Sequence, residues 1–138
     1  MAFVLDASMT VAWCFVDEGS TFTEGVLDLL IQEPAIVPVI WPFEVANALL
    51  VGERRQRTNA SQVSASLQQL LDLPISIDDA MFSTAWGTVV AIARQYELAV
   101  YDAAYVELAQ RRSIPIATID VRQRDTAVRL GVPLVTVE

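Results

Sequence analysis

The feature that most constrains the fold is a series of short, continuously apolar runs separated by longer segments with helical spacing. The runs lie at residues 3–6, 35–40, 74–77, 98–100, 114–119 and 133–137. Helices are expected at about 7–15, 22–32, 42–57, 61–71, 79–96, 102–112 and 121–130. Strands buried on both faces of a parallel sheet read as uninterrupted apolar runs. The alternation therefore predicts an α/β fold with a parallel sheet covered on both faces.

The length of the chain predicts one domain, residues 1–138, with no internal repeat or linker. Hydrophobic residues make up 54% of the sequence, yet no run approaches the roughly 20 apolar residues of a membrane span. The N-terminal residues MAFVLDAS lack a basic leader, so we expect no signal peptide and a cytoplasmic protein. The single Cys14 excludes an internal disulfide and is interpreted as a core residue.

The absence of two residue types narrows the possible chemistry. The sequence contains no histidine and no lysine, and all nine basic residues are arginines. This excludes Ser-His and Cys-His nucleophile pairs, His-bearing zinc sites and Schiff-base lysines. The net charge of −8 argues against broad, nonspecific phosphate binding. Any reaction must therefore use carboxylates, hydroxyls, arginines or a metal ion.

Three aspartates follow predicted strands and precede predicted helices. Asp6 ends the run FVLD, Asp102 follows LAV by one residue, and Asp120 ends IPIATID. In an open α/β sheet, ligands bind beyond the carboxyl ends of the strands. Aspartate is also a favoured helix N-cap, so each residue taken alone is more simply explained as a cap. Asp78 occupies a similar position and is interpreted only as a cap.

Glu44 favours the functional interpretation. In WPFEVANALLV, the apolar spacing from Trp41 places Glu44 on the inward face of a helix. A buried carboxylate is costly unless it is paired or bound to a cation, and the nearest arginines are more than two turns away. Asn47 lies at i+3 and is a candidate hydrogen-bond partner. A half-exposed Glu44 pointing toward solvent is the alternative.

If the fold brings Asp6, Glu44, Asp102 and Asp120 together, their like charges would raise one another's pKa values. A divalent cation would relieve this repulsion. Because the ligands are all hard oxygens, Mg²⁺ or Mn²⁺ is the expected metal.

Four segments in order resemble the PIN-domain family, and more narrowly the VapC-type ribonuclease toxins. They are VLDAS, WPFEVANAL, LAVYDAAYVELA and PIATID followed by LGVPLV, and together they extend from about residue 2 to residue 137. The resemblance implies a three-layer α/β/α sandwich with a central parallel sheet. It also implies a Mg²⁺- or Mn²⁺-dependent endoribonuclease, the toxin of a type II toxin–antitoxin pair.

The resemblance assigns roles to particular residues. The four acids Asp6, Glu44, Asp102 and Asp120 would form the catalytic site, with Asp6 and Asp102 as the metal ligands. Ser8 and Thr118 would hold the site by hydrogen bonds, in addition to the Asn47 contact inferred above. Asp125 departs from the family pattern, in which apolar or basic residues are more usual, and is interpreted as a surface residue.

The remaining expectations concern partners. Arg54 and Arg55 are tentative RNA contacts, although a solvated helix end is the simpler interpretation. In the resembled toxins, the helices corresponding to ANALLV and to the segment with Leu67 and Leu70 form a groove for a VapB-type antitoxin. The resemblance also implies a homodimer. The main alternative is a catalytically silent PIN-like module that acts through protein contacts.

Overall fold

The computed structural model describes residues 1–80 and 82–137, and its centre is a parallel sheet of four short strands. The strands are β1 (Phe3–Leu5), β2 (Ala35–Val37), β3 (Ile75–Ile77) and β4 (Ile116–Ala117), in the spatial order β3-β2-β1-β4. Val4 of β1 lies opposite Ile36 on one side and Ile116 on the other. The predicted parallel sheet is confirmed.

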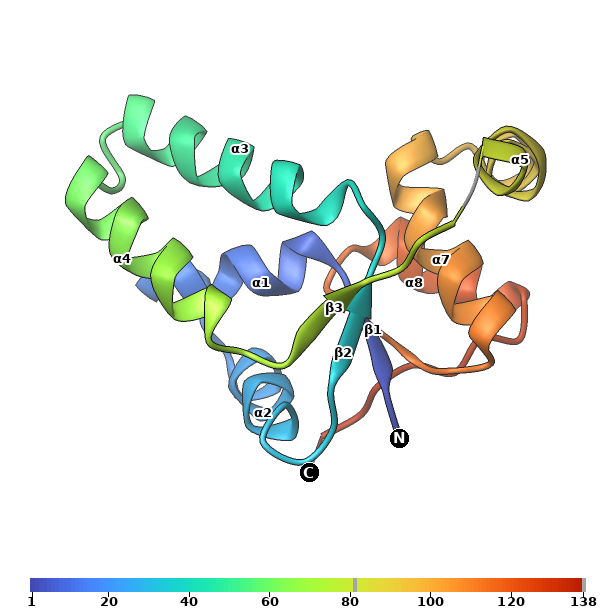
Figure 1. The fold of residues 1–138 in the computed structure, drawn as a ribbon, viewed down its shortest axis with the longest axis horizontal. Coiled ribbons are helices and arrows are strands. Elements are labelled where there is room, and N and C mark those ends of the chain that lie inside the picture. The colour runs from blue at the N-terminus through green and yellow to red at the C-terminus, as the bar shows by residue number, and fades with distance from the viewer. Residues whose placement is uncertain (81, 138) are drawn as a thin grey trace.

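Helices cover both faces of the sheet and give a three-layer α/β/α arrangement (Figure 1). On one side lie α1 (Ala7–Cys14), η1 (Val16–Glu18), α2 (Thr21–Leu29), α3 (Trp41–Arg54) and α4 (Ala60–Leu71). On the other lie α5 (Phe82–Thr84), η2 (Ala85–Val89), α6 (Val90–Tyr96), α7 (Val100–Arg112) and α8 (Val121–Arg129). The connecting helices therefore change from one face of the sheet to the other between β3 and β4. Because β4 lies next to β1, the place where the ends of β1 and β4 meet is a topological switch point.

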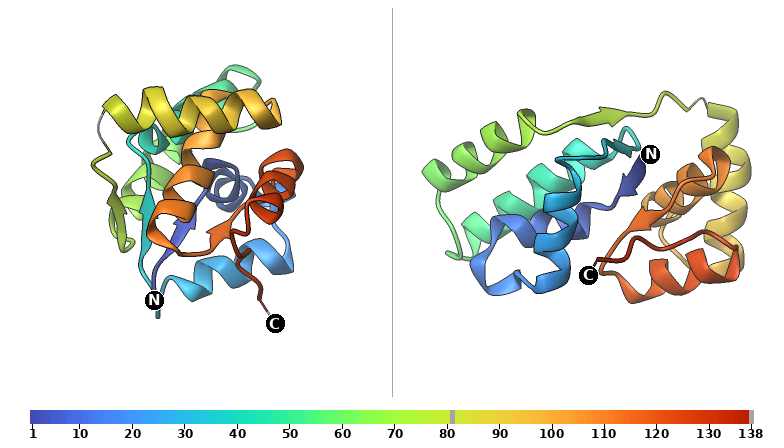
Figure 2. Two further views of the ribbon diagram at one scale, coloured as in Figure 1. Left: turned by 90° about the vertical axis from the view of Figure 1, so that its right-hand side faces the viewer. Right: turned by 90° about the horizontal axis from the view of Figure 1, so that it is seen from below.

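Local sequence signals explain where several helices begin. The side chains of Asp6, Ser20, Asn59 and Asp120 each accept a hydrogen bond from a backbone N–H in the first turn of the helix that follows. Pro42 lies in the first turn of α3, where a missing N–H costs nothing. The right-hand view of Figure 2 shows the helices of the N-terminal half, in blue to green, on the opposite side from those of the C-terminal half, in yellow to red.

Three predicted elements differ from the structure. Residues 98–100 do not form a strand, because α7 already begins at Val100 after a left-handed turn at Glu97. The predicted strand at 133–137 is reduced to an isolated bridge between Ile116 and Leu134. The helix expected from residue 79 begins at Phe82 and contains a π-helical turn, and its residue 81 lies outside the described residues.

The core lies on both sides of β1. Phe3, Val4 and Leu5 are fully buried, and Leu49 from α3 and Leu108 from α7 are buried within the same cluster. Burial of all three β1 residues explains why this strand has no polar position until Asp6. Across the described ranges, no helix is both long and apolar enough to cross a lipid bilayer.

Candidate active site

Asp6 is the most buried of the four predicted acids, with 4% of its surface exposed. It follows β1 directly and caps α1, accepting hydrogen bonds from the backbone N–H of Ser8 at 3.0 Å and from the Ser8 hydroxyl. The Thr118 hydroxyl donates to the same carboxylate at 3.3 Å, and the Gln123 amide donates at 3.2 Å. Ser8 and Thr118 both contact Asp6 in this way, and their role in holding a catalytic site stays a prediction.

Burial raises the pKa of Asp6, and the hydrogen bonds from Ser8 and Gln123 oppose this effect without cancelling it. The negative charge of Asp120 raises the pKa further. The carboxylate is thus held firmly but kept in an environment that disfavours its charge. A bound cation would instead favour the charged form of Asp6.

Glu44 lies in the first turn of α3 and is half-buried, which is between the predicted inward position and the half-exposed alternative. The buried hydroxyl of Tyr105 donates to Glu44 Oε1 at 2.7 Å. Among the described residues, the Glu44 side chain accepts no other hydrogen bond, so the predicted contact with Asn47 is not formed. Asn47, one turn further along the helix, is exposed.

The pKa of Glu44 is raised, chiefly by burial and also by the negative charges of Asp6 and Asp102. The hydrogen bond from Tyr105 acts in the opposite direction. Glu44 therefore belongs to the same electrostatic environment as two other predicted site residues.

Asp102 reaches the site from a helix and not from the end of a strand, which corrects the sequence prediction. It lies in the first turn of α7, whose N-cap residue is Ala99. Asp102 is therefore not the cap of this helix, although a carboxylate near a helix N-terminus is favoured by the helix dipole. Burial, followed by the charges of Asp6 and Asp120, raises its pKa.

Asp120 follows β4 by two residues and caps α8, because its Oδ1 accepts a hydrogen bond from the Gln123 backbone at 3.0 Å. Its own N–H donates to the Thr118 hydroxyl at 3.0 Å. Thr118 thus connects the carboxylate of Asp6 to the backbone of Asp120 across neighbouring strands.

The fold brings the four predicted acids into one electrostatic group, since each interacts with at least one other through its charge. Their donor atoms are carboxylate oxygens, which suit Mg²⁺ or Mn²⁺. Within residues 1–80 and 82–137, however, no three acidic, His or Cys side chains form a compact, ready-made set of metal ligands. The chemistry of the donor set fits a hard divalent cation, and the raised pKa values mark the charge that such a cation would balance.

Sequence reasoning missed two site residues, Tyr105 and Gln123. Tyr105 lies three residues after Asp102, which places both on one face of α7. Gln123 lies three residues after Asp120, in the D-x-x-Q pattern of a capping box. Its side chain instead turns toward Asp6, where its amide forms the hydrogen bond described above.

Several arginines have structural partners. Arg111 and Arg112 both bind the buried carboxylate of Asp78, with shortest N–O distances of 2.6 Å, and Arg111 also pairs with Glu107. Asp78 is therefore chiefly an anchor between the end of β3 and α7, not the cap of a long helix. Burial alone would raise the pKa of Asp78, but the two arginines outweigh it and lower that pKa.

Arg54 and Arg55 are exposed at the far end of α3. Ten residues separate Arg54 from Glu44, so they lie about 15 Å apart along the helix axis. Arg57, in the same basic segment, pairs with Asp17 and Glu18. The prediction of RNA contacts at Arg54 and Arg55 stays a prediction.

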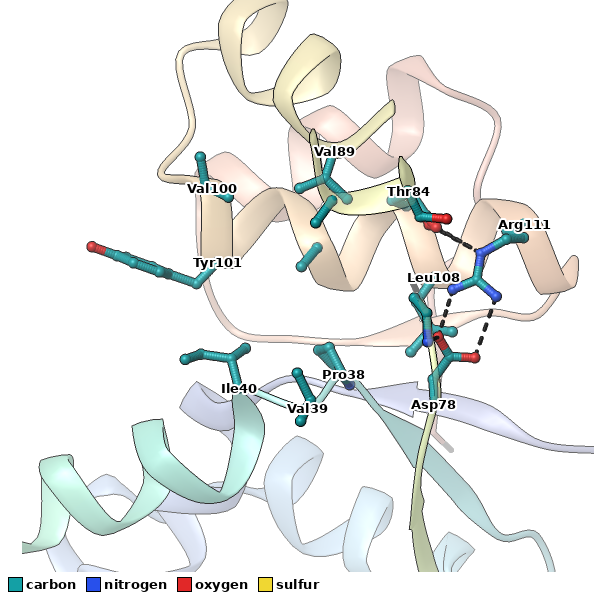
Figure 3. A pocket seen from close by; sticks show the side chains of 14 residues that line it. Pro38, Val39, Ile40, Asp78, Thr84, Val89, Val100, Tyr101, Leu108 and Arg111 are labelled. Carbon is teal, nitrogen blue, oxygen red and sulfur yellow. Dashed lines mark hydrogen bonds and ion pairs between the residues drawn. The ribbon is translucent and has the colours of Figure 1, made fainter. Parts of the chain in front are cut away.

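Two cavities have largely apolar linings. The first, of about 230 Å³, lies between residues 38–40 and α7, and Figure 3 shows Ile40 and Tyr101 at one end with the Asp78–Arg111 pair at the other. The second, of about 330 Å³, lies between α3 and α4. Its lining includes Trp41, Val45 and Leu67.

Comparison with solved structures identifies the same fold in three proteins. PAE2754 from Pyrobaculum aerophilum has a TM-score of 0.68 at 20% identity, covering 95% of this chain and 98% of that chain. VapBC2 from Rickettsia felis, solved with a promoter DNA fragment, has a TM-score of 0.68 at 13% identity and full coverage of both chains. VapC20 from Mycobacterium tuberculosis, a sarcin-ricin loop cleaving toxin, has a TM-score of 0.64 at 14% identity, covering 91% and 94%.

No curated protein sequence matches the chain. The family model of the PIN domain does match, over residues 3–129. That range contains all four acids and all four strands of the sheet. The chain therefore belongs to the PIN domain family.

Proposed function

We propose that this protein is a metal-dependent endoribonuclease and the toxin of a VapC-type toxin–antitoxin pair. The observation that carries the proposal is the electrostatic coupling of Asp6, Glu44, Asp102 and Asp120 at the edge of the sheet where β1 and β4 end. The fold shared with VapC20, a toxin that cleaves the sarcin-ricin loop, supports RNA as the substrate class. An RNA substrate would place the protein in the cytoplasm.

In this proposal, Asp6 and Asp102 hold Mg²⁺ or Mn²⁺. The bound ion would lower the pKa of water and neutralise charge that develops on a phosphate. Glu44 and Asp120 orient the water that attacks phosphorus in line. The raised pKa makes Glu44 a stronger base than an ordinary glutamate, which suits it to accept the proton of that water. Attack by water leaves a 5′-phosphate and a 3′-hydroxyl.

The first test is incubation of the purified chain with total cellular RNA in Mg²⁺, in Mn²⁺ and in EDTA, beside the Asp6→Asn variant. We expect discrete cuts that require the metal and are absent with the variant, and sequencing of the new ends should show 5′-phosphates. Cyclic-phosphate ends would contradict the mechanism, because they imply attack by the RNA 2′-hydroxyl. Absence of both cleavage and Mn²⁺ binding would favour a catalytically silent binding module.

We also propose that a VapB-type antitoxin inserts an apolar segment between α3 and α4. The support is the cavity of about 330 Å³ at this place, which is lined almost entirely by apolar side chains. VapBC2 provides an example of the fold in a toxin–antitoxin complex. Leu67→Glu should abolish co-elution with the antitoxin while leaving metal-dependent RNA cleavage intact. If Leu67→Glu loses RNA cleavage as well as antitoxin binding, the variant has misfolded, and its result does not support this groove as the antitoxin site.

A homodimer is the third part of the proposal. Val39, Val100 and Tyr101 are 64%, 48% and 54% exposed around the first apolar cavity, and the rings of Phe82 and Trp86 stack nearby at 5.0 Å. Exposed apolar surface of this kind marks contact sites. Sedimentation should give a dimer for the wild type and a monomer for Trp86→Glu. A wild-type monomer would contradict the proposal.

A further inference from the structure

Gln123 is fully buried in the first turn of α8, and it contacts two of the four acidic residues, Asp6 and Asp102. Its side-chain Nε2 donates one hydrogen bond to Asp6 Oδ1 at 3.2 Å and another to the backbone carbonyl of Asp102 at 3.0 Å. Asp6 follows β1 and Asp102 belongs to α7, so one amide group connects three elements of the fold. Burying an amide is costly unless its hydrogen bonds are satisfied, which makes this position unusual for a purely structural residue.

The direction of the amide follows from its neighbours. Both groups facing Nε2 are acceptors, a carboxylate and a carbonyl. If the amide were rotated by half a turn, its oxygen would face two other oxygens, which repel it. The amide donors are therefore fixed toward Asp6 and Asp102, and this leaves the amide oxygen on the other side.

The amide oxygen has no partner. In the described part of the chain, Gln123 Oε1 is the single buried side-chain N or O atom without a hydrogen bond. Buried polar atoms in native proteins almost always have a partner, either protein or ordered water. A structural role would be served as well by an apolar side chain of this size. The unsatisfied oxygen instead indicates that the position is kept for what its two donors do.

We propose that Gln123 is a positioning residue that holds Asp6 and Asp102 in a fixed relative arrangement for binding a divalent cation. The proposal rests on the function proposed above, in which these two acids are the metal ligands. Gln123 acts through the acids and not on the cation or the RNA. Groups that orient metal ligands by hydrogen bonds affect metal affinity by about 10- to 100-fold when they are removed.

The test compares Gln123→Met with Thr126→Val. Methionine has nearly the volume of glutamine but donates no hydrogen bond. Thr126 is a matched control, because it is also buried in α8, one turn beyond Gln123, and its hydroxyl donates to the Arg122 carbonyl at 2.9 Å. Mn²⁺ affinity is measured by titration calorimetry. Thermal stability is measured separately, in EDTA, to check that each variant folds. Gln123→Leu, which is also close in size and donates no hydrogen bond, serves if the methionine variant does not fold.

We expect Gln123→Met and Gln123→Leu to bind Mn²⁺ at least about 10-fold more weakly than the wild type, whereas Thr126→Val binds normally. RNA cleavage by Gln123→Met should recover most of the wild-type kcat at saturating Mn²⁺, because the acids themselves are intact. Unchanged Mn²⁺ affinity in both Gln123 variants, or an equal loss in Thr126→Val, would overturn the proposal.

A second measurement separates this inference from the proposed function. The side-chain amide protons of Gln123 should exchange slowly with water in metal-free protein and should shift in the NMR spectrum of Asp6→Asn. If the wild type binds no Mn²⁺, the metal-dependent function fails, and slow exchange would still support the contact of Gln123 with both acids. Rapid exchange of these protons would overturn the positioning role whatever the metal does.

Discussion

Replacing Tyr105 with phenylalanine should lower the free energy of unfolding and also perturb the proposed metal site. The Tyr105 side chain is fully buried, and its hydroxyl lies 2.7 Å from Glu44 Oε1. A hydrogen bond to a charged group contributes about 1.5–3 kcal/mol to stability. Because Glu44 is half-exposed, water can replace the lost donor, so we expect a loss near the lower limit, about 1.5 kcal/mol. For a chain of this length, that corresponds to a decrease in Tm of about 5 °C.

The same substitution should change the pH dependence in a defined direction. Burial raises the pKa of Glu44 and the Tyr105 hydrogen bond lowers it, so removing the hydroxyl raises that pKa further. The loss of stability should be largest at pH values above the folded-state pKa of Glu44, where its carboxyl group is ionised, and should shrink as the pH falls through that pKa. If ionised Glu44 is required for catalysis, the acidic limb of the kcat/KM profile moves to higher pH.

The assays are urea denaturation across pH 4–8 and initial RNA cleavage rates over the same range. Tyr96→Phe is the control, because it makes the same chemical change in α6, outside the acidic site. Equal losses of stability in the two variants, or an unshifted acidic limb in Tyr105→Phe, would refute the reasoning.

Three further predictions follow from the charges. Asp102→Asn should raise the Tm in EDTA at neutral pH, because burial and the charges of Asp6 and Asp120 disfavour the ionised form; a lower Tm would count against this. Asp78→Asn should cost about 2 kcal/mol in urea denaturation at pH 7, below the usual range because its arginine partners are about 40% exposed. Since the pKa of Asp78 is lowered, this contribution should persist above pH 3.8 and disappear at lower pH. Arg122→Gln, two residues from Asp120, should raise the KM for RNA and leave the Tm unchanged. The slope of log RNA affinity against log salt concentration should become shallower by about 1.

The sequence predicted the sheet because its apolar runs are short and uninterrupted, and it placed Asp6 and Asp120 correctly because each follows a true strand. It misjudged Asp102, since the run LAV is too short to distinguish a strand from the start of a buried helix. The tertiary structure decided that question, through the left-handed turn at Glu97 that ends α6.

Asp78 shows a different limit. An aspartate before a helical segment has the pattern of a cap, and nothing local distinguishes it from Asp120. Its partners, Arg111 and Arg112, lie more than 30 residues away, on a helix that reaches the end of β3 only in the folded chain. Gln123 was missed for the same reason, because its contact with Asp6 joins opposite ends of the sequence.

Two of the four acids also begin helices, and this shapes which inactive alleles a cell could tolerate. Asp6 caps α1 and Asp120 caps α8, whereas Asp102 caps nothing. If the chain is the proposed toxin, a selection for survivors of its expression should therefore accumulate substitutions at Asp102 as abundant, folded protein that still sequesters the antitoxin. Most substitutions at Asp120 should lower abundance as well, with asparagine as the exception, since it caps a helix about as well as aspartate.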